Sequence, residues 1–334
     1  MEKFCLGNIY SRLGDEESRF LFEKRLCYSL TGDMPRMVCA TNEKIIKKLL
    51  EIRKDFFIFG AGCNGHSVVR DIPEISWHAF IDNDESKVGK PDILPIISFQ
   101  EFISNSENAA VFIASTIYSN EMKQQLINNG FPEDSIITQI FGIQYFDLPY
   151  FKPQKNEFFI DAGGYDGVTT KSFFQWLRNN ERKEGRSVIF EPNPIQYALC
   201  KHNLKNCDNV KIENKGLWHK SEHLNFMKNH AASRITTDGE ETIETISLDE
   251  YLKNEKNPVT FIKMDIEGAE LNALKGAERT IREQKPKLAI CIYHKPKDVW
   301  EIPNLLLDFV PDYKFYIRHY SLMGIETVLY AQPS

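Results

Sequence analysis

Short apolar runs alternate with amphipathic segments through most of the chain. FFIF at residues 56–59, WHAFID at 77–82 and AAVFIAS at 109–115 have the pattern of buried strands, with helical segments between them. The alternation restarts at EFFID (157–161) and continues through SVIFE, VTFIKMD and KLAICIY. Strands alternating with helices predict parallel sheets covered by helices on both faces. We therefore predict an α/β fold with two tandem doubly wound, Rossmann-like domains.

The two ends of the chain depart from this alternation. DEESRFLFEKRLCYSL, from Asp15, and NEKIIKKLLEI, from Asn42, have the spacing of amphipathic helices. YKFYIRHY and ETVLYAQ, with a turn around Met323–Gly324, predict an antiparallel hairpin. The predicted organisation is a helical N-terminal segment over 1–50, a Rossmann-like domain over 51–142, a linker over 143–155 and a second Rossmann-like domain over 156–334.

Composition narrows the class of protein. A chain of 334 residues is long enough for two cores, and its 41 basic and 47 acidic residues give a net charge of −6, which argues against nucleic acid as a partner. No apolar stretch is long enough for a membrane span or a signal peptide. The seven cysteines form no CxxC pair, so we expect reduced thiols in a cytoplasmic protein.

The first glycine-rich loop is a GxGxxG sequence between a strand and a helix. It consists of Gly60, Gly62 and Gly65, and Asp82 ends the next strand about twenty residues on. Amides at the start of a helix suit a phosphate. The pattern predicts a nucleotide or phosphate site, but the same glycines also fit a scaffold in which they only allow tight turns.

The second glycine-rich loop differs because an acid precedes it. Asp161 stands directly before the loop of Gly163, Gly164 and Gly167. A carboxylate there repels a pyrophosphate and attracts a cation. S-adenosylmethionine fits, since it carries an ammonium and a sulfonium but no phosphate, and Glu191 at the end of the next strand can accept hydrogen bonds from its ribose. The alternative is that Asp161 only forms the turn.

Five motifs follow one another in the second half of the chain: FIDAGGYDGVTT, FEPNP, SLDEY, IKMDIEGAELNALKGA and YHKP. Together they resemble the FkbM-type S-adenosylmethionine-dependent methyltransferases over residues 156–334. The resemblance implies O-methylation of sugars, glycans or secondary metabolites, and a seven-stranded sheet with an antiparallel last strand. IFGAGCNG, AFIDNDESKVGK and VFIAS resemble the small N-terminal domain of sugar acyltransferases, which implies a nucleotide-sugar or sugar-phosphate ligand.

The candidate catalytic residues lie where strands end at the carboxyl edge of the second sheet. In MDIEGAE, Asp265 is expected nearest the methyl group, where it orients the acceptor or the cofactor. Glu267 and Glu270 follow at the helix start and are expected to help bind a hydroxyl or a divalent cation. Acids at a helix N-terminus are also favourable with the helix dipole alone. His294 is the candidate general base, with a structural role as the alternative. Three acids this close in sequence allow a divalent metal but do not indicate one.

Two further segments are candidates for acceptor contacts. Arg318 and His319, in YIRHY, can bind an anionic part of the acceptor or form a solvated hairpin face. The polar stretch from His230 to Thr242 has the character of a mobile loop over the site, with Ser233 and Arg234 as contacts.

The leading hypothesis is an S-adenosylmethionine-dependent O-methyltransferase acting on a hydroxyl of a sugar, glycan or nucleotide-linked sugar. One alternative is a non-catalytic sugar-nucleotide-binding or assembly protein. Another, less favoured, is an NAD-dependent oxidoreductase that uses the first glycine loop, which lacks a Tyr-x-x-x-Lys pair after it. The N-terminal helices could pair subunits in a homo-oligomer.

Overall fold

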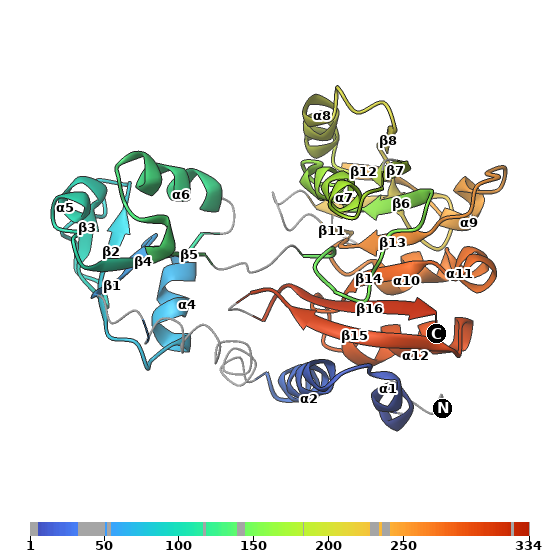
Figure 1. Cartoon of the computed structure of the whole chain (residues 1–334), viewed down its shortest axis with the longest axis horizontal. Coiled ribbons are helices and arrows are strands. Elements are labelled where there is room, and N and C mark those ends of the chain that lie inside the picture. Colours follow the sequence, from blue (N-terminus) through green and yellow to red (C-terminus); the bar gives the residue numbers. More distant parts are fainter. Residues whose placement is uncertain are drawn as a thin grey trace. The chain divides into compact units, whose positions relative to one another are not determined.

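The computed structural model describes residues 6–32, 51, 55–115, 118–138, 144–182, 184–227, 234–235, 241–321 and 324–333. The chain forms two compact units. The larger comprises residues 1–30, 143–318 and 326–334, and the smaller comprises residues 31–142 and 319–325. Each contains a sheet flanked by helices (Figure 1), which confirms the predicted α/β class with two Rossmann-like sheets.

The smaller unit contains a five-stranded parallel sheet in the order β3-β2-β1-β4-β5. Successive side chains of its central strand enter different apolar clusters: Ile58 packs in one and Phe59 in the other. Both faces are therefore buried, as expected for a parallel sheet. Its strands are β1 (Asp55–Phe59), β2 (Trp77–Asp82), β3 (Ile96–Ser98), β4 (Ala109–Ile113) and β5 (Ile136–Thr138), with helices α4 (Cys63–Asp71), α5 (Phe99–Ser104), α6 (Ser119–Asn128) and the 3₁₀ turn η1 (Glu133–Ser135).

The larger unit is built on a seven-stranded sheet in the order β15-β16-β14-β13-β6-β7-β8. Five strands are parallel, and β16 pairs antiparallel with β14, with Leu288 opposite Ala331. This confirms the antiparallel end of the sheet. The strands are β6 (Glu157–Ala162), β7 (Gly185–Phe190), β8 (Val210–Glu213), β13 (Phe261–Met264), β14 (Lys287–Cys291), β15 (Tyr313–His319) and β16 (Thr327–Pro333).

The helices of this unit begin at recognisable signals. α8 starts with Pro194, and the side chain of Asn193 caps it by accepting from the Ile195 amide at 3.0 Å. Ser247 caps the short α9 in the same way. The helices are α7 (Val168–Asn179), α8 (Pro194–Asn203), α9 (Leu248–Tyr251), α10 (Glu270–Lys275), α11 (Glu278–Gln284) and α12 (Asp298–Phe309).

The N-terminal helices α1 (Leu6–Arg12) and α2 (Glu16–Thr31) belong to the larger unit. Ile9 and Leu21 lie in the same apolar core as Phe315 of β15, and the helices run beside that end of the sheet (Figure 1). In the described part of the chain, no helix has the length and apolar character needed to cross a bilayer. The helix predicted from Asn42 lies outside the described residues, apart from Glu51.

A second, four-stranded sheet joins the larger unit in the order β11-β10-β12-β9. It extends into the segment expected to be a strand-poor loop, so that expectation is wrong in part. His230 and Ser233 lie outside the described residues, and so does the side chain of Arg234. The strands are β9 (Gly216–Leu217), β10 (Glu222–Met227), β11 (Arg234–Ile235) and β12 (Glu241–Ile246).

The segment expected to be a linker packs into the larger unit. Phe146 and Phe151 are buried, and their rings lie 5.9 and 5.6 Å from the ring of Phe261 in β13. The preceding Tyr145 is also buried. Residues 144–151 therefore contribute to the core and bring a tyrosine to the sheet.

Candidate active site

The loop between β6 and α7 lies directly against the end of β13. Gly163 has a φ of +81°, and a Cβ added there would lie 1.9 Å from the carbonyl oxygen of Asp265. Gly167, with a φ of +82°, is the N-cap of α7, and its amide donates to the carbonyl of Gly164 at 2.7 Å. A side chain at position 163 would force the two segments apart, so glycine is required by packing as well as by conformation.

Asp161 is fully buried beneath this loop rather than exposed within it. Its Oδ1 lies 3.1 Å from Nζ of Lys263, and its Oδ2 accepts from the hydroxyl of Thr170 at 2.9 Å. Lys263 also donates to the carbonyl oxygens of Ala162 and Gly163, at 3.2 and 2.6 Å. The expectation of a carboxylate facing a cationic ligand is therefore corrected: the charge of Asp161 is matched by a buried lysine, and the pair fixes the loop.

Glu191 follows β7 and closes the other side of the loop. Its Oε2 accepts from the Tyr165 amide and its Oε1 from the Asn193 amide, both at 2.9 Å. Burial raises the pKa of Glu191, although these two amides oppose the shift. A carboxylate oxygen can accept more than one hydrogen bond. Glu191 thus retains capacity to bind a pair of hydroxyl groups while the backbone holds it in place.

Asp265 follows β13 and is bound by two tyrosines. Its Oδ2 accepts from the hydroxyl of Tyr145 at 3.0 Å, and its Oδ1 from the hydroxyl of Tyr293 at 3.1 Å. Burial alone would raise the pKa of Asp265, but the Lys263 ammonium and then His294 hold it below the ordinary value. Neither tyrosine was identified from the sequence, since Tyr145 lies in the expected linker and Tyr293 in an apolar strand.

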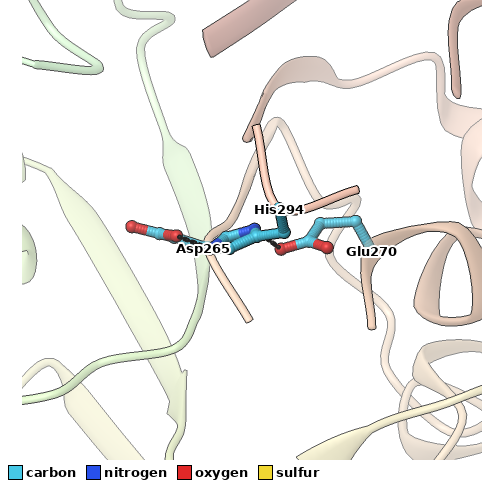
Figure 2. A group of neighbouring side chains, drawn as sticks. All are labelled: Asp265, Glu270 and His294. Carbon is cyan, nitrogen blue, oxygen red and sulfur yellow. Dashed lines mark ion pairs between the residues drawn. The ribbon is translucent and has the colours of Figure 1, made fainter. Parts of the chain in front are cut away.

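His294, after β14, lies between acidic side chains (Figure 2). Its Nδ1 is 2.9 Å from Oε1 of Glu270, and its Nε2 is 3.5 Å from both Oδ1 of Asp265 and Oε2 of Glu267. These contacts are ion pairs, and neither ring nitrogen makes a hydrogen bond to a described residue. Burial would lower the pKa of His294, but Glu270 and the two other acids raise it to about 9.

The raised pKa changes the expectation for His294. Its pKa was expected near the working pH of a general base, whereas these acids keep the imidazole protonated at neutral pH. Glu270 is fully buried, and its Oε1 also accepts from the Ile266 amide at 2.9 Å. Glu270 therefore lies behind the histidine rather than at the surface where an acceptor would bind.

Arg318 and His319 do not join this group. Arg318 donates to Oδ2 of Asp15 at 2.7 Å and to the hydroxyl of Ser18 at 3.1 Å, which ties β15 to α2. His319 is buried at the end of the same strand. The predicted solvated face and the predicted anion contact are both corrected for Arg318, because its guanidinium is engaged with the N-terminal helix.

The first glycine loop is stabilised by the acid that follows it. Oδ2 of Asp82 accepts from the Ala61 amide at 2.9 Å and from Nζ of Lys87 at 3.0 Å. A Cβ on Gly65 would lie 2.1 Å from the carbonyl oxygen of Gly60, while one on Gly62 would meet open space. Asp82 thus supports the turn. These contacts agree with the interpretation of the loop as a scaffold whose glycines allow a tight turn.

A hollow of about 500 Å³ lies elsewhere, lined by Phe158, Arg186 and Val210 among others. These residues stand at the amino ends of β6, β7 and β8. Ligands of doubly wound sheets bind at the carboxyl ends of the strands. We therefore place the candidate site at the carboxyl edge, around Glu191 and Asp265.

Comparison with known proteins finds a matching family model and a curated relative. Residues 161–317 match the family model described as the methyltransferase FkbM domain. The chain is 31% identical over 123 residues to the hexuronic acid methyltransferase AglP of Haloferax volcanii, a match that covers 35% of this chain and 51% of that protein. The chain thus spans about half the length of this curated relative.

A solved structure shares the fold over nearly the whole chain. It is the methyltransferase FkbM from Methylobacillus flagellatus KT, at a TM-score of 0.52 and 17% identity. The match covers 95% of this chain and 99% of that one. At this identity the likeness establishes the fold alone.

Proposed function

We propose that the protein transfers the methyl group of S-adenosylmethionine to a hydroxyl of a sugar, glycan or nucleotide-linked sugar, because residues 161–317 match the model of the methyltransferase FkbM domain. The observation that carries the proposal is the position of Glu191 and Asp265. The two acids follow strands β7 and β13, on either side of β6 and its glycine loop. One suits the ribose of the cofactor, and the other suits the reacting end.

In this proposal the glycine loop receives the methionine half of the cofactor. The loop packs closely against Asp265 at Gly163 and against Ile189 at Gly164, and Gly167 is the N-cap of the helix that follows it. Glu191 accepts hydrogen bonds from the ribose hydroxyls. Asp161 acts indirectly, since its pair with Lys263 sets the loop conformation.

Asp265, Glu267 and His294 form the acceptor side. In methyl transfer the acceptor oxygen forms a bond to the methyl carbon as the carbon–sulfur bond breaks, and the sulfonium leaves as a neutral thioether. The hydroxyl proton departs to a base or to water. Most of the acceleration comes from alignment of oxygen, methyl carbon and sulfur, so we assign these side chains to binding and orienting the hydroxyl.

The acceptor is proposed from the curated relative that the chain matches over 123 residues. AglP is named for methylation of a hexuronic acid. We therefore place uronic acids, free or nucleotide-linked, first among the acceptors to be tested.

Cofactor binding tests the first half of the proposal. Calorimetric titration with S-adenosylhomocysteine should give micromolar affinity, about −8 kcal/mol. Glu191→Gln should weaken it at least about tenfold, because hydrogen bonds to a charged group contribute about 1.5–3 kcal/mol. Glu278→Gln, which changes an acid on the exposed side of α11, is the control and should bind normally. A wild-type protein that binds no S-adenosylhomocysteine would refute the proposal.

Transfer tests the second half. The protein is incubated with methyl-labelled S-adenosylmethionine and each candidate acceptor, and label in the sugar is measured. Label in a uronic acid, lost in Asp265→Asn, supports the assigned acceptor. Binding of S-adenosylhomocysteine without transfer to any saccharide would leave the cofactor assignment standing and remove the acceptor assignment.

A further inference from the structure

Three acidic side chains surround one histidine on the acceptor side. Asp265, Glu267 and Glu270 each have an oxygen within 3.5 Å of a ring nitrogen of His294. Figure 2 shows Asp265 and Glu270 on either side of the ring. The nearby ammonium of Lys263 bonds to Asp161 and to two carbonyl oxygens. Three carboxylates thus gather around one imidazole, an arrangement that attracts a cation.

The spacing of the ligand atoms fits a metal ion. An oxygen of Asp265, an oxygen of Glu270 and one ring nitrogen of His294 lie within 4.8 Å of one another, with Glu270 on the Nδ1 side of the ring and Asp265 on the Nε2 side. Nε2 is 3.5 Å from oxygens of both Asp265 and Glu267, which is long for a hydrogen bond. Atoms that bind one cation at about 2.1 Å lie about 3.0–3.5 Å apart for bond angles of 90–110°. The 3.5 Å separations are thus those of two ligands around one ion.

The histidine itself points to a ligand. Its side chain is 8% exposed, and neither ring nitrogen makes a hydrogen bond to a described residue. A buried polar group without a hydrogen bond is costly unless something else satisfies it. Nε2 is directed at the two acids that border the acceptor side, where a metal ion would satisfy it.

Glu270 completes a recurring arrangement of metal sites. A histidine that binds a metal through one nitrogen commonly has a carboxylate against the other, which fixes the ring. Oε1 of Glu270 lies 2.9 Å from Nδ1 and also accepts from the Ile266 amide. The Ile266 amide, just before α10, thus helps to hold the Glu270 carboxylate behind the imidazole.

We propose that Asp265, Glu267 and Nε2 of His294 bind one divalent cation of the Mn²⁺ or Mg²⁺ type, with Glu270 positioning the imidazole. Two carboxylates and one imidazole leave coordination positions for water or for oxygens of the acceptor. Resting on the proposed function, the ion would bind the hydroxyl to be methylated and lower its pKa. On binding the ion, His294 would release the proton of Nε2 to solvent and act as a ligand rather than a general base.

Backbone conformation supports the role of Glu267. It is a non-glycine residue with a φ of +55°, followed by Gly268 at +89°. Residues other than glycine in this region carry strain of about 1–3 kcal/mol, which is retained mainly at functional positions. The turn directs the Glu267 carboxylate back towards His294 instead of along α10.

Mn²⁺ binding followed by electron paramagnetic resonance tests the site without cofactor or acceptor. Protein freed of metal with a chelator is titrated with MnCl₂, and loss of the free-ion signal measures binding. We expect one ion per chain. Asp265→Asn and Glu267→Gln should each weaken binding at least tenfold, and Glu270→Gln by about 10- to 100-fold. Glu278→Gln should bind like the wild type.

Titration with S-adenosylhomocysteine in chelator separates this inference from the proposed function. Variants that bind S-adenosylhomocysteine normally are folded, so their loss of Mn²⁺ supports the site. No Mn²⁺ binding by the wild type, or binding unchanged in all three site variants, would overturn the inference while leaving the cofactor assignment intact. Mn²⁺ binding without S-adenosylhomocysteine binding would support the metal site and refute the proposed cofactor.

Discussion

Replacing Gly163 by alanine tests whether the cofactor loop and the acceptor side depend on each other. The new Cβ would lie 1.9 Å from the carbonyl oxygen of Asp265, whereas ordinary contact begins at 3.4 Å, so one segment must move by about 1.5 Å. The residue would also occupy a φ of +81°, which costs an alanine about 1–2 kcal/mol. Overpacking adds about 1–3 kcal/mol.

Two other glycine variants separate these effects. Gly167→Ala meets the same backbone penalty, at a φ of +82°, but its Cβ contacts the side chain of Leu204 instead of backbone. Gly216→Ala has neither problem, since its nearest contacts are 3.4 Å away. Gly163→Ala should therefore lose about 2–5 kcal/mol of unfolding free energy, Gly167→Ala less, and Gly216→Ala little.

Affinity for S-adenosylhomocysteine provides the second readout. A displacement of about 1 Å in a site can reduce function about 100-fold, so Gly163→Ala should bind at least tenfold more weakly than Gly216→Ala. Thermal unfolding and calorimetry measure the two quantities on the same preparations. If Gly163→Ala unfolds and binds like Gly216→Ala, the close approach of the loop to Asp265 does not exist in solution and the reasoning fails.

Three further predictions follow from the charged and hydrogen-bonded contacts. Glu157→Gln leaves the buried ammonium of Lys287 without the carboxylate 2.5 Å away, and should lower the free energy of unfolding, measured by thermal unfolding, by about 3–5 kcal/mol. Adding Lys287→Met should restore much of this stability. A double variant no more stable than the single variant would contradict the prediction. Burial would raise the pKa of Asp15, but hydrogen bonding to Arg318 lowers it. The contribution of this pair to the free energy of unfolding is therefore present above the unfolded pKa and lost as pH falls below about 4. Arg318→Gln should remove about 1 kcal/mol of that free energy at pH 7, together with its acid dependence. Tyr145→Phe removes a hydrogen bond to the carboxylate after β13 and should slow methyl transfer about 10- to 100-fold with S-adenosylhomocysteine affinity unchanged; an unaltered rate would exclude this tyrosine from the acceptor side.

The sheet and its edge were predictable because their signals are local. The apolar run before Asp161 and the glycines after it define a strand, a turn and a helix from consecutive residues. Parallel strands place their carboxyl ends at one edge, so Glu191, Asp265 and His294 could be expected together before any contact was known. The antiparallel end of the sheet followed from two alternating segments around one turn.

The partners of these residues were not predictable, because they come from distant parts of the chain. Tyr145 reaches Asp265 from a segment that resembled a linker, and nothing in its neighbours indicates that its hydroxyl is buried beside a carboxylate. Lys263 lies two positions before Asp265 in an apolar strand, yet its ammonium bonds to Asp161 on the adjacent strand. Such pairs depend on strand register and side-chain direction, which a single sequence does not specify.

The two motifs that identify the domain are in fact parts of one packed structure. Lys263 donates to the carbonyl oxygen of Gly163, and Gly163 abuts the carbonyl of Asp265. The DAGGYDG loop therefore cannot shift without moving the end of β13, and with it the carboxylate that faces His294. In a displacement reaction the donor and acceptor must be held at a fixed separation. Under the proposed methyl transfer, packing the two motifs against each other through a glycine and a buried lysine would provide that separation from backbone, which is more rigid than side-chain contacts alone.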